Sequence, residues 1–254
     1  MKLKSAAATH VGKIRTNNED NYFLNGIYKK DICENIRRDE SEKQKKRNIY
    51  AVCDGVGGEE AGERASLLAV ETLSEHERED VLKYIENANK NICCEIKKQK
   101  GIRMGSTLAL LKVEGNKAET YNVGDSRIYI FREGKLKQLS KDHTRVQQMV
   151  DAGILSRDEI KKSKERHVIT QHLGIFPYEF VLSPYVIKNM LIKPGDIFLL
   201  CSDGLTDMLE DDEIRRILSY CKNELPIVAV NNLILSSLDK GGKDNITVII
   251  VKVE

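Results

Sequence analysis

Six short runs rich in Val, Ile, Leu and Tyr, each bounded by turn residues, constrain the fold of this chain more than any other feature of its sequence. Residues of these types favour β-strands. We therefore expect strands at residues 48–53, 106–113, 118–123, 128–131, 197–201 and 246–253. Glu133-Gly134, between the fourth run and residues 136–139, predicts a hairpin turn.

Helices are expected in the intervals between these strands. Val81, Ile85, Ala88, Ile92 and Ile96 recur at the spacing of one helical face. Three more helices are expected at 61–73, at 211–220, which begins with acids, and at 226–238, which begins with proline. Strands that mostly follow one another, with helices gathered in between, favour an α+β fold over alternating β-α-β units.

The size and charge of the chain exclude several classes of protein. Its 254 residues, 41% of them hydrophobic, can bury one core, so we expect a single domain over 1–254. Lys and Arg number 41 and Asp and Glu 39, a balance that points to neither nucleic acid nor membrane as a partner. The apolar runs are too short to span a bilayer, the N-terminus lacks a signal-peptide core, and the six cysteines form no CxxC pair. We expect a cytoplasmic monomer.

Two segments are expected to lie on the surface. Residues 28–47 contain thirteen charged residues in twenty, which predicts a long mobile loop between two strands. Its basic end, 43–47, is interpreted as solvated, with a docking patch as the alternative. Residues 143–167 contain a short amphipathic helix and then a charged piece at 158–166, which either flanks a cleft or decorates the surface.

Aspartates stand at the ends of the expected strands. Asp54 and Asp203 follow apolar runs and precede glycines, Asp125 lies between two strands, and Asp244 precedes the last one. If these strand ends converge, the crowded carboxylates require protonation or bound cations. Oxygen ligands without Cys or His favour Mg²⁺ or Mn²⁺. Each Asp-Gly pair alone is more typical of a turn, and one sequence does not show that the four sites converge.

An ordered series of motifs resembles the metal-dependent protein phosphatase family, also called protein phosphatase 2C, in its compact bacterial form. The motifs span nearly the whole chain, and the ordered set is far more specific than any one of them. They are Gly12-Lys13-Ile14-Arg15, Asn18-Glu19-Asp20, Asp54-Gly55-Val56-Gly57-Gly58, Gly105-Ser106-Thr107, Gly124-Asp125-Ser126-Arg127, Asp142-His143-Thr144, residues 169–174, Ser202-Asp203-Gly204-Leu205 and Gly242-Lys243-Asp244-Asn245-Ile246-Thr247.

The resemblance implies a four-layer α-β-β-α sandwich, in which two antiparallel sheets are flanked by helices, with two Mn²⁺ or Mg²⁺ ions at one end. Asp54 would bridge both ions, Asp203 and Asp244 would complete one, and Glu19 with the carbonyl of Gly55 would complete the other. Two further residues have implied roles: Asp20 would hold metal-bound water, and Arg15 would bind the substrate phosphate.

Several residue roles remain open within the resemblance. Some family members have a histidine acid two residues after the bridging aspartate, where this chain has Val56. His143, His167 or water would then protonate the leaving group. Asp125 either helps Asp203 to hold a third ion, or only caps its turn or pairs with Arg127. Arg127 itself either contacts substrate or holds the Asp125 loop.

The implied activity is hydrolysis of phosphoserine and phosphothreonine in proteins by water held between the two ions. The implied partners are a Ser/Thr protein kinase and the proteins that it phosphorylates. The alternatives are a catalytically inactive phosphoprotein-binding module and a hydrolase of small phosphate esters on the same fold. The residues argue against the inactive module, because Glu19, Asp54, Asp203 and Asp244 are all present.

Overall fold

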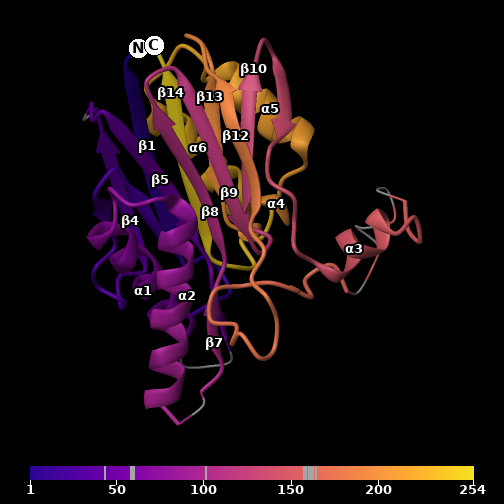
Figure 1. Ribbon diagram of the computed structural model, residues 1–254. Helices are drawn as coiled ribbons and strands as arrows, with labels where there is room; N and C mark the ends of the chain where they lie inside the picture. Colours follow the sequence, from indigo (N-terminus) through magenta and orange to yellow (C-terminus); the bar gives the residue numbers. More distant parts are fainter. Residues whose placement is uncertain (43, 58–60, 101, 157–158, 160–162, 164) are drawn as a thin grey trace.

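Two antiparallel sheets lie face to face at the centre of the computed structural model, which describes residues 1–42, 44–57, 61–100, 102–156, 159, 163 and 165–254 (Figure 1). One sheet has the strand order β11 (Lys135–Gln138), β10 (Arg127–Arg132), β13 (Ile197–Cys201), β14 (Ile246–Val253), β1 (Leu3–His10) and β4 (Ile36–Ser41). The other has the order β12 (Tyr185–Leu191), β9 (Lys117–Val123), β8 (Leu108–Glu114), β5 (Arg47–Cys53), β2 (Asn21–Leu24) and β3 (Ile27–Tyr28). A short pair, β6 (Gly55–Gly57) and β7 (Met104–Ser106), continues from the second sheet.

Helices cover both outer faces of the sandwich. The second sheet packs against α1 (Gly62–Glu75) and α2 (Val81–Lys98), and the first against α4 (Asp203–Thr206), α5 (Asp211–Tyr220) and α6 (Pro226–Asp239). The short helix α3 (Arg145–Asp151) projects to one side of the body (Figure 1). The expected α+β fold, in its four-layer α-β-β-α form, is therefore confirmed.

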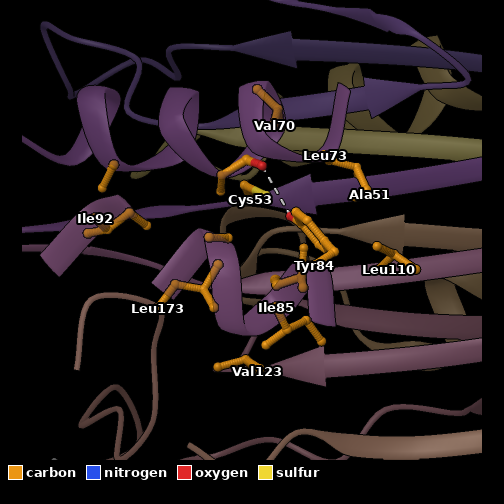
Figure 2. Close-up of a cluster of buried hydrophobic side chains, with 14 of the residues drawn as sticks. Ala51, Cys53, Val70, Leu73, Tyr84, Ile85, Ile92, Leu110, Val123 and Leu173 are labelled. Carbon is orange, nitrogen blue, oxygen red and sulfur yellow. Dashed lines mark hydrogen bonds between the residues drawn. The ribbon is translucent and has the colours of Figure 1, made fainter. Parts of the chain in front are cut away.

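Strand β5 shows why this sequence forms layers. Successive side chains of a strand point to opposite faces, so Ile49 and Ala51 pack under α1 and α2 while Tyr50 and Val52 pack between the sheets. Both faces are buried, which explains the continuous apolar run. Figure 2 shows the helix-side cluster, where the Tyr84 hydroxyl donates a hydrogen bond of 3.1 Å to the carbonyl of Ala69.

The segment 28–47 differs from the predicted loop. Strand β4 lies inside it and pairs with β1, from Ser5 opposite Ser41 to His10 opposite Ile36. The prediction was wrong because an edge strand needs main-chain partners rather than apolar side chains, and charged residues suit such an edge. Of the basic end, residues 44–47 are described and Lys43 lies outside the described residues.

Other differences have similar causes. The run 106–113 divides into β7 and β8 at Thr107, whose main chain turns to bond Asp54. Strand β1 was not expected because its centre is Ala6-Ala7-Ala8, without the bulky residues that mark a strand. Strand β12 was not predicted because it is a largely exposed edge strand.

The helix expected within 143–167 is α3, and the charged piece 158–166 lies mostly outside the described residues.

No helix among the described residues is long and apolar enough to cross a membrane. All six cysteines are free, with Cys33 and Cys94 exposed and the other four buried.

Candidate metal centre

The strand pairing brings the predicted acidic residues to one end of the sandwich. In the first sheet, Cys201 at the end of β13 lies opposite Val248, near the start of β14. In the second sheet, Cys53 at the end of β5 lies opposite Asn21, the first residue of β2. Asp203, Asp244, Asp54 and the Glu19-Asp20 pair adjoin these positions, so they gather at the end opposite the two chain termini (Figure 1).

Asp54 lies at the focus of these charges. Burial raises the pKa of its carboxyl well above the ordinary value, and Asp20, Asp203, Asp125 and Asp244 raise it further by repulsion. The pKa of Asp203 is raised in the same way, first by burial and then by its acidic neighbours. Carboxylates that repel one another in this way form a site for cations.

Asp20 is fully buried beside this cluster. Its Oδ2 accepts hydrogen bonds from Ser202 Oγ at 2.8 Å and from Thr247 Oγ1 at 2.7 Å. Its Oδ1 is also buried and has no hydrogen-bond partner among the described residues. Burial raises its pKa to about 6, against the two hydrogen bonds, which lower it. A buried acceptor without a partner fits the predicted role of Asp20 in holding water near bound ions.

Two glycines bring the backbone close to Glu19. A Cβ atom at Gly55 would lie 2.2 Å from the carbonyl oxygen of Gly62 and 2.7 Å from that of Glu19, and one at Gly62 would lie 2.7 Å from Glu19 Oε2. Only glycine fits this approach. Burial, followed by repulsion from Glu63, raises the pKa of Glu19 to about 7. The carboxylate of Glu19 and the backbone of Gly55 thus form one side of the site.

Two uncharged residues brace the site. Asn245 accepts a hydrogen bond of 2.8 Å from the main-chain N–H of Glu19 and donates two of 2.9 Å to the carbonyls of Val11 and Asn17. Thr107 Oγ1 accepts from the N–H of Asp54 at 2.9 Å, while its own N–H donates to the carbonyl of Asp54 at 2.8 Å. Asn245 and Thr107 both lie within the family motifs, and no other feature of the sequence indicated that they belong to the site.

Arg15 lies at the open side of the acidic cluster. Its Nη2 is 2.8 Å from Asp244 Oδ2, and 53% of its side chain is exposed. The hydrogen bond to Asp244 raises the pKa of the guanidinium, which carries a positive charge at all ordinary pH values. A partly exposed cation beside the carboxylates can reach an anionic substrate.

Asp125 is buried next to the cluster, but its predicted partner binds elsewhere. The guanidinium of Arg127 pairs with Asp142, with Nη2 at 2.7 Å from Oδ2 and Nε at 3.0 Å from the same oxygen. Neither an Asp125–Arg127 ion pair nor a direct Arg127 hold on the Asp125 loop is therefore observed. Proximity in sequence suggested that pairing, whereas the hairpin brings Asp142 closer to Arg127. Burial, followed by repulsion from Asp142, raises the pKa of Asp125 to about 7, and a cation bound nearby would favour its charged form.

The two histidines take different positions. His143 Nδ1 accepts a hydrogen bond of 3.2 Å from the N–H of Gly124, so His143 supports the Asp125 loop. His167, at the other end of the segment 143–167, lies near the acidic cluster. Its Nδ1 is 3.9 Å from Asp203 Oδ2 and its Nε2 is 3.6 Å from Asp207 Oδ2. Asp207 was not predicted from the sequence, although an acid one helical turn after Asp203 is a usable signal.

The donor set fits hard divalent cations. Glu19, Asp54, Asp203 and Asp244 offer carboxylate oxygens, and the Gly55 backbone approaches through a space that a side chain would fill. Such all-oxygen sites suit Mg²⁺ and Mn²⁺. The predicted ligand residues are therefore gathered in one place.

Comparison with known proteins agrees with this geometry. The model of the family described as protein phosphatase 2C matches residues 8–148. The chain is 31% identical to serine/threonine protein phosphatase PstP of Mycobacterium tuberculosis over 99% of its own length, and it spans 45% of that protein. It is also 31% identical to protein phosphatase PhpP of Streptococcus pneumoniae, with 98% of this chain and 97% of that one covered.

Solved structures show the same fold. The crystal structure of M. tuberculosis PstP/Ppp is 30% identical with a TM-score of 0.81, and the whole of both chains is covered. The PstP catalytic domain in complex with two manganese ions is 30% identical with a TM-score of 0.77, and 99% of this chain and 98% of that one are covered.

Proposed function

Because the chain belongs to the protein phosphatase 2C family, we propose that it is a metal-dependent hydrolase of phosphoserine and phosphothreonine in proteins. The observation that carries this proposal is the half-buried cluster of carboxylates around Asp54, which one exposed arginine reaches. When bound, two divalent ions supply an activated water and neutralise the charge of the phosphoryl oxygens. The two manganese ions of the PstP structure support this number, and we propose Mn²⁺ or Mg²⁺ here.

Each residue has a distinct proposed role. Asp54 would contact both ions, Asp203 and Asp244 would hold one, and Glu19 with the Gly55 carbonyl would hold the other. Asp20 orients water through its unpaired Oδ1. Arg15 binds the phosphate, and because a guanidinium has five N–H donors it can do so while it contacts Asp244.

We further propose that Asp125 and Asp203 hold a third, weaker ion. After burial, repulsion from Asp125 is the largest cause of the raised pKa of Asp203, so the two carboxyls lie close enough to interact. The absence of an Asp125–Arg127 pair among the described ion pairs favours this role over a pairing with Arg127.

The proposed partners are inferred from the names of the relatives. We propose that the substrates are phosphoserine and phosphothreonine proteins and that a Ser/Thr protein kinase phosphorylates them. We also propose that the protein acts as a cytoplasmic monomer without a nucleic-acid or membrane partner, in keeping with its nearly balanced charge.

The substrate class is tested by comparing kcat/KM for a phosphothreonine peptide, a free nucleotide and an aryl phosphate, each with Mn²⁺. We expect the peptide and the aryl phosphate to be hydrolysed and the nucleotide to be a poor substrate. Faster turnover of the nucleotide would assign the chain to small phosphate esters. No turnover of any substrate by the metal-loaded protein would favour a binding module.

Arg15→Ala separates phosphate binding from chemistry. We expect KM for the phosphopeptide to rise about tenfold or more, since a charge-assisted hydrogen bond is lost, with a smaller fall in kcat. Bound metal, counted by atomic emission, should stay unchanged. Lys13→Ala, which removes an exposed cation two residues away, is the matched control. Wild-type KM in Arg15→Ala would remove this arginine from the phosphate site.

A further inference from the structure

A groove of about 600 Å³ lies between the C-terminal end of α2, strand β7 and the segment 172–179. Its lining includes buried Ile96 and Met104 and half-buried Phe176, while Tyr178 stands at the rim with 79% of its surface exposed. Phe176 and Tyr178 stack with their ring centroids 5.2 Å apart. The groove thus has an apolar floor and an exposed aromatic edge, a combination typical of peptide-binding surfaces.

Among the described residues that line the groove, two are cations and one is an acid, so this lining has a net positive charge. Lys97 Nζ lies 5.4 Å from the centre of the Phe176 ring, and neither Lys97 nor Arg103 forms an ion pair with any residue that the structure describes. Glu179 also lines the groove, and its carboxylate accepts a hydrogen bond from the N–H of Phe176, so the described lining has one negative charge against two positive ones. The charge of the groove therefore complements an acidic ligand.

The wall of the groove is continuous with the metal centre. Strand β7 pairs with β6, with Met104 opposite Gly57 and Ser106 opposite Gly55, and β6 directly follows Asp54. In addition, Ser106 and Leu173 exchange two main-chain hydrogen bonds of 3.0 and 2.7 Å, which fix the segment 172–179 to β7. From Met104 to Thr107, which bonds Asp54, the chain advances about 10 Å at strand spacing.

We propose that this groove binds the residues of a phosphoprotein that flank its phosphorylated residue. An extended peptide covers about 3.3 Å per residue, so a substrate with its phosphate near Asp54 reaches the groove about three to five residues away. The preferred flanking residues are Asp or Glu, which pair with Arg103 and Lys97, next to a large apolar residue that packs on Phe176 and Tyr178. This inference rests on the proposed function and deepens it by naming the substrate class.

The test compares two phosphothreonine peptides of equal length with p-nitrophenyl phosphate, which has no flanking residues. One peptide carries Glu and Leu three to five positions from the phosphothreonine on both sides, and the other carries Lys and Ser there. We expect wild-type kcat/KM to be about fivefold higher for the acidic peptide, the scale of an exposed ion pair. Arg103→Glu should abolish or reverse this preference, and the change should lie in KM for the peptides. Its kcat/KM for p-nitrophenyl phosphate should differ from the wild-type value by less than about twofold.

Two further variants make the test specific. Lys83→Glu introduces the same charge change at an exposed lysine near the start of α2, and it should keep the wild-type preference. Tyr178→Ala, at an exposed rim position, should lower kcat/KM for the acidic apolar peptide without changing hydrolysis of the aryl phosphate.

The possible failures are distinguishable. Equal wild-type rates for the two peptides, or an unchanged preference in Arg103→Glu, would overturn the groove assignment and leave the proposed function intact. An equal loss on the aryl phosphate and the peptides would mean that Arg103 acts on the metal centre, and it too overturns the assignment. A wild-type protein that hydrolyses the aryl phosphate but neither peptide would overturn the proposed function together with the groove.

Discussion

Asp54→Asn is expected to lower kcat by about a thousandfold or more, because the loss of one preorganised electrostatic contact alone costs ~10²–10³. Asparagine keeps the shape of the side chain but not the charge by which Asp54 would hold two ions. The variant should therefore bind less Mn²⁺, measured by calorimetry, and should hydrolyse neither peptide nor aryl phosphate at an appreciable rate.

The same substitution should stabilise the metal-free protein. Burial and repulsion raise the pKa of Asp54 in the folded state, so its ionised form destabilises the fold once the pH exceeds the ordinary carboxyl value. Without metal and at neutral pH, Asp54→Asn should thus unfold at a higher temperature than wild type. Asp212→Asn, at a side chain that is 83% exposed and pairs with Arg215, is the control; it should keep wild-type activity and lower stability by at most about 1 kcal/mol. Wild-type kcat in Asp54→Asn would refute the proposed site.

Removal of metal is expected to abolish turnover completely, and Mn²⁺ or Mg²⁺ should restore it. Ions that bind only the folded state stabilise it by about 2.7 kcal/mol at a hundred times their Kd, so the melting temperature should fall by about 5 °C or more on chelation. Full activity after verified removal of metal would contradict the mechanism.

A Mn²⁺ titration of Asp125→Ala tests the third ion. The variant should keep two tightly bound ions and lose one weak one, while kcat falls more for a phosphopeptide than for an aryl phosphate, whose leaving group needs little protonation. Equal losses on both substrates, or the loss of a tight ion, would instead support a structural role for Asp125.

The sequence revealed the elements whose own residues determine them. Runs such as Ile197–Cys201 are strands because both faces are buried, and α2 shows its buried face directly in its spacing. Strands β1 and β4 were not visible, because small or charged residues join a sheet through main-chain bonds to partners far along the chain.

The sequence predicted which residue types form the site, but it did not show that these residues lie close together in the fold. Their convergence depends on pairings such as β13 with β14 and β5 with β2, which no local pattern encodes. The resemblance to a family supplied that convergence. The Arg127–Asp142 pair and the approach of His167 to Asp207 depend on loop paths, and neither was anticipated.

The position of β14 has a consequence for biosynthesis. This strand lies between β1 and β13, and through Thr247 it holds Thr9 and Asp20, so groups up to 238 positions apart must meet before the cluster exists. A nascent chain that has not yet released β14 from the ribosome cannot assemble the centre. Contacts of such long range also slow folding. We therefore expect newly made chains to gain phosphatase activity only after synthesis has passed this strand, in a late and cooperative step.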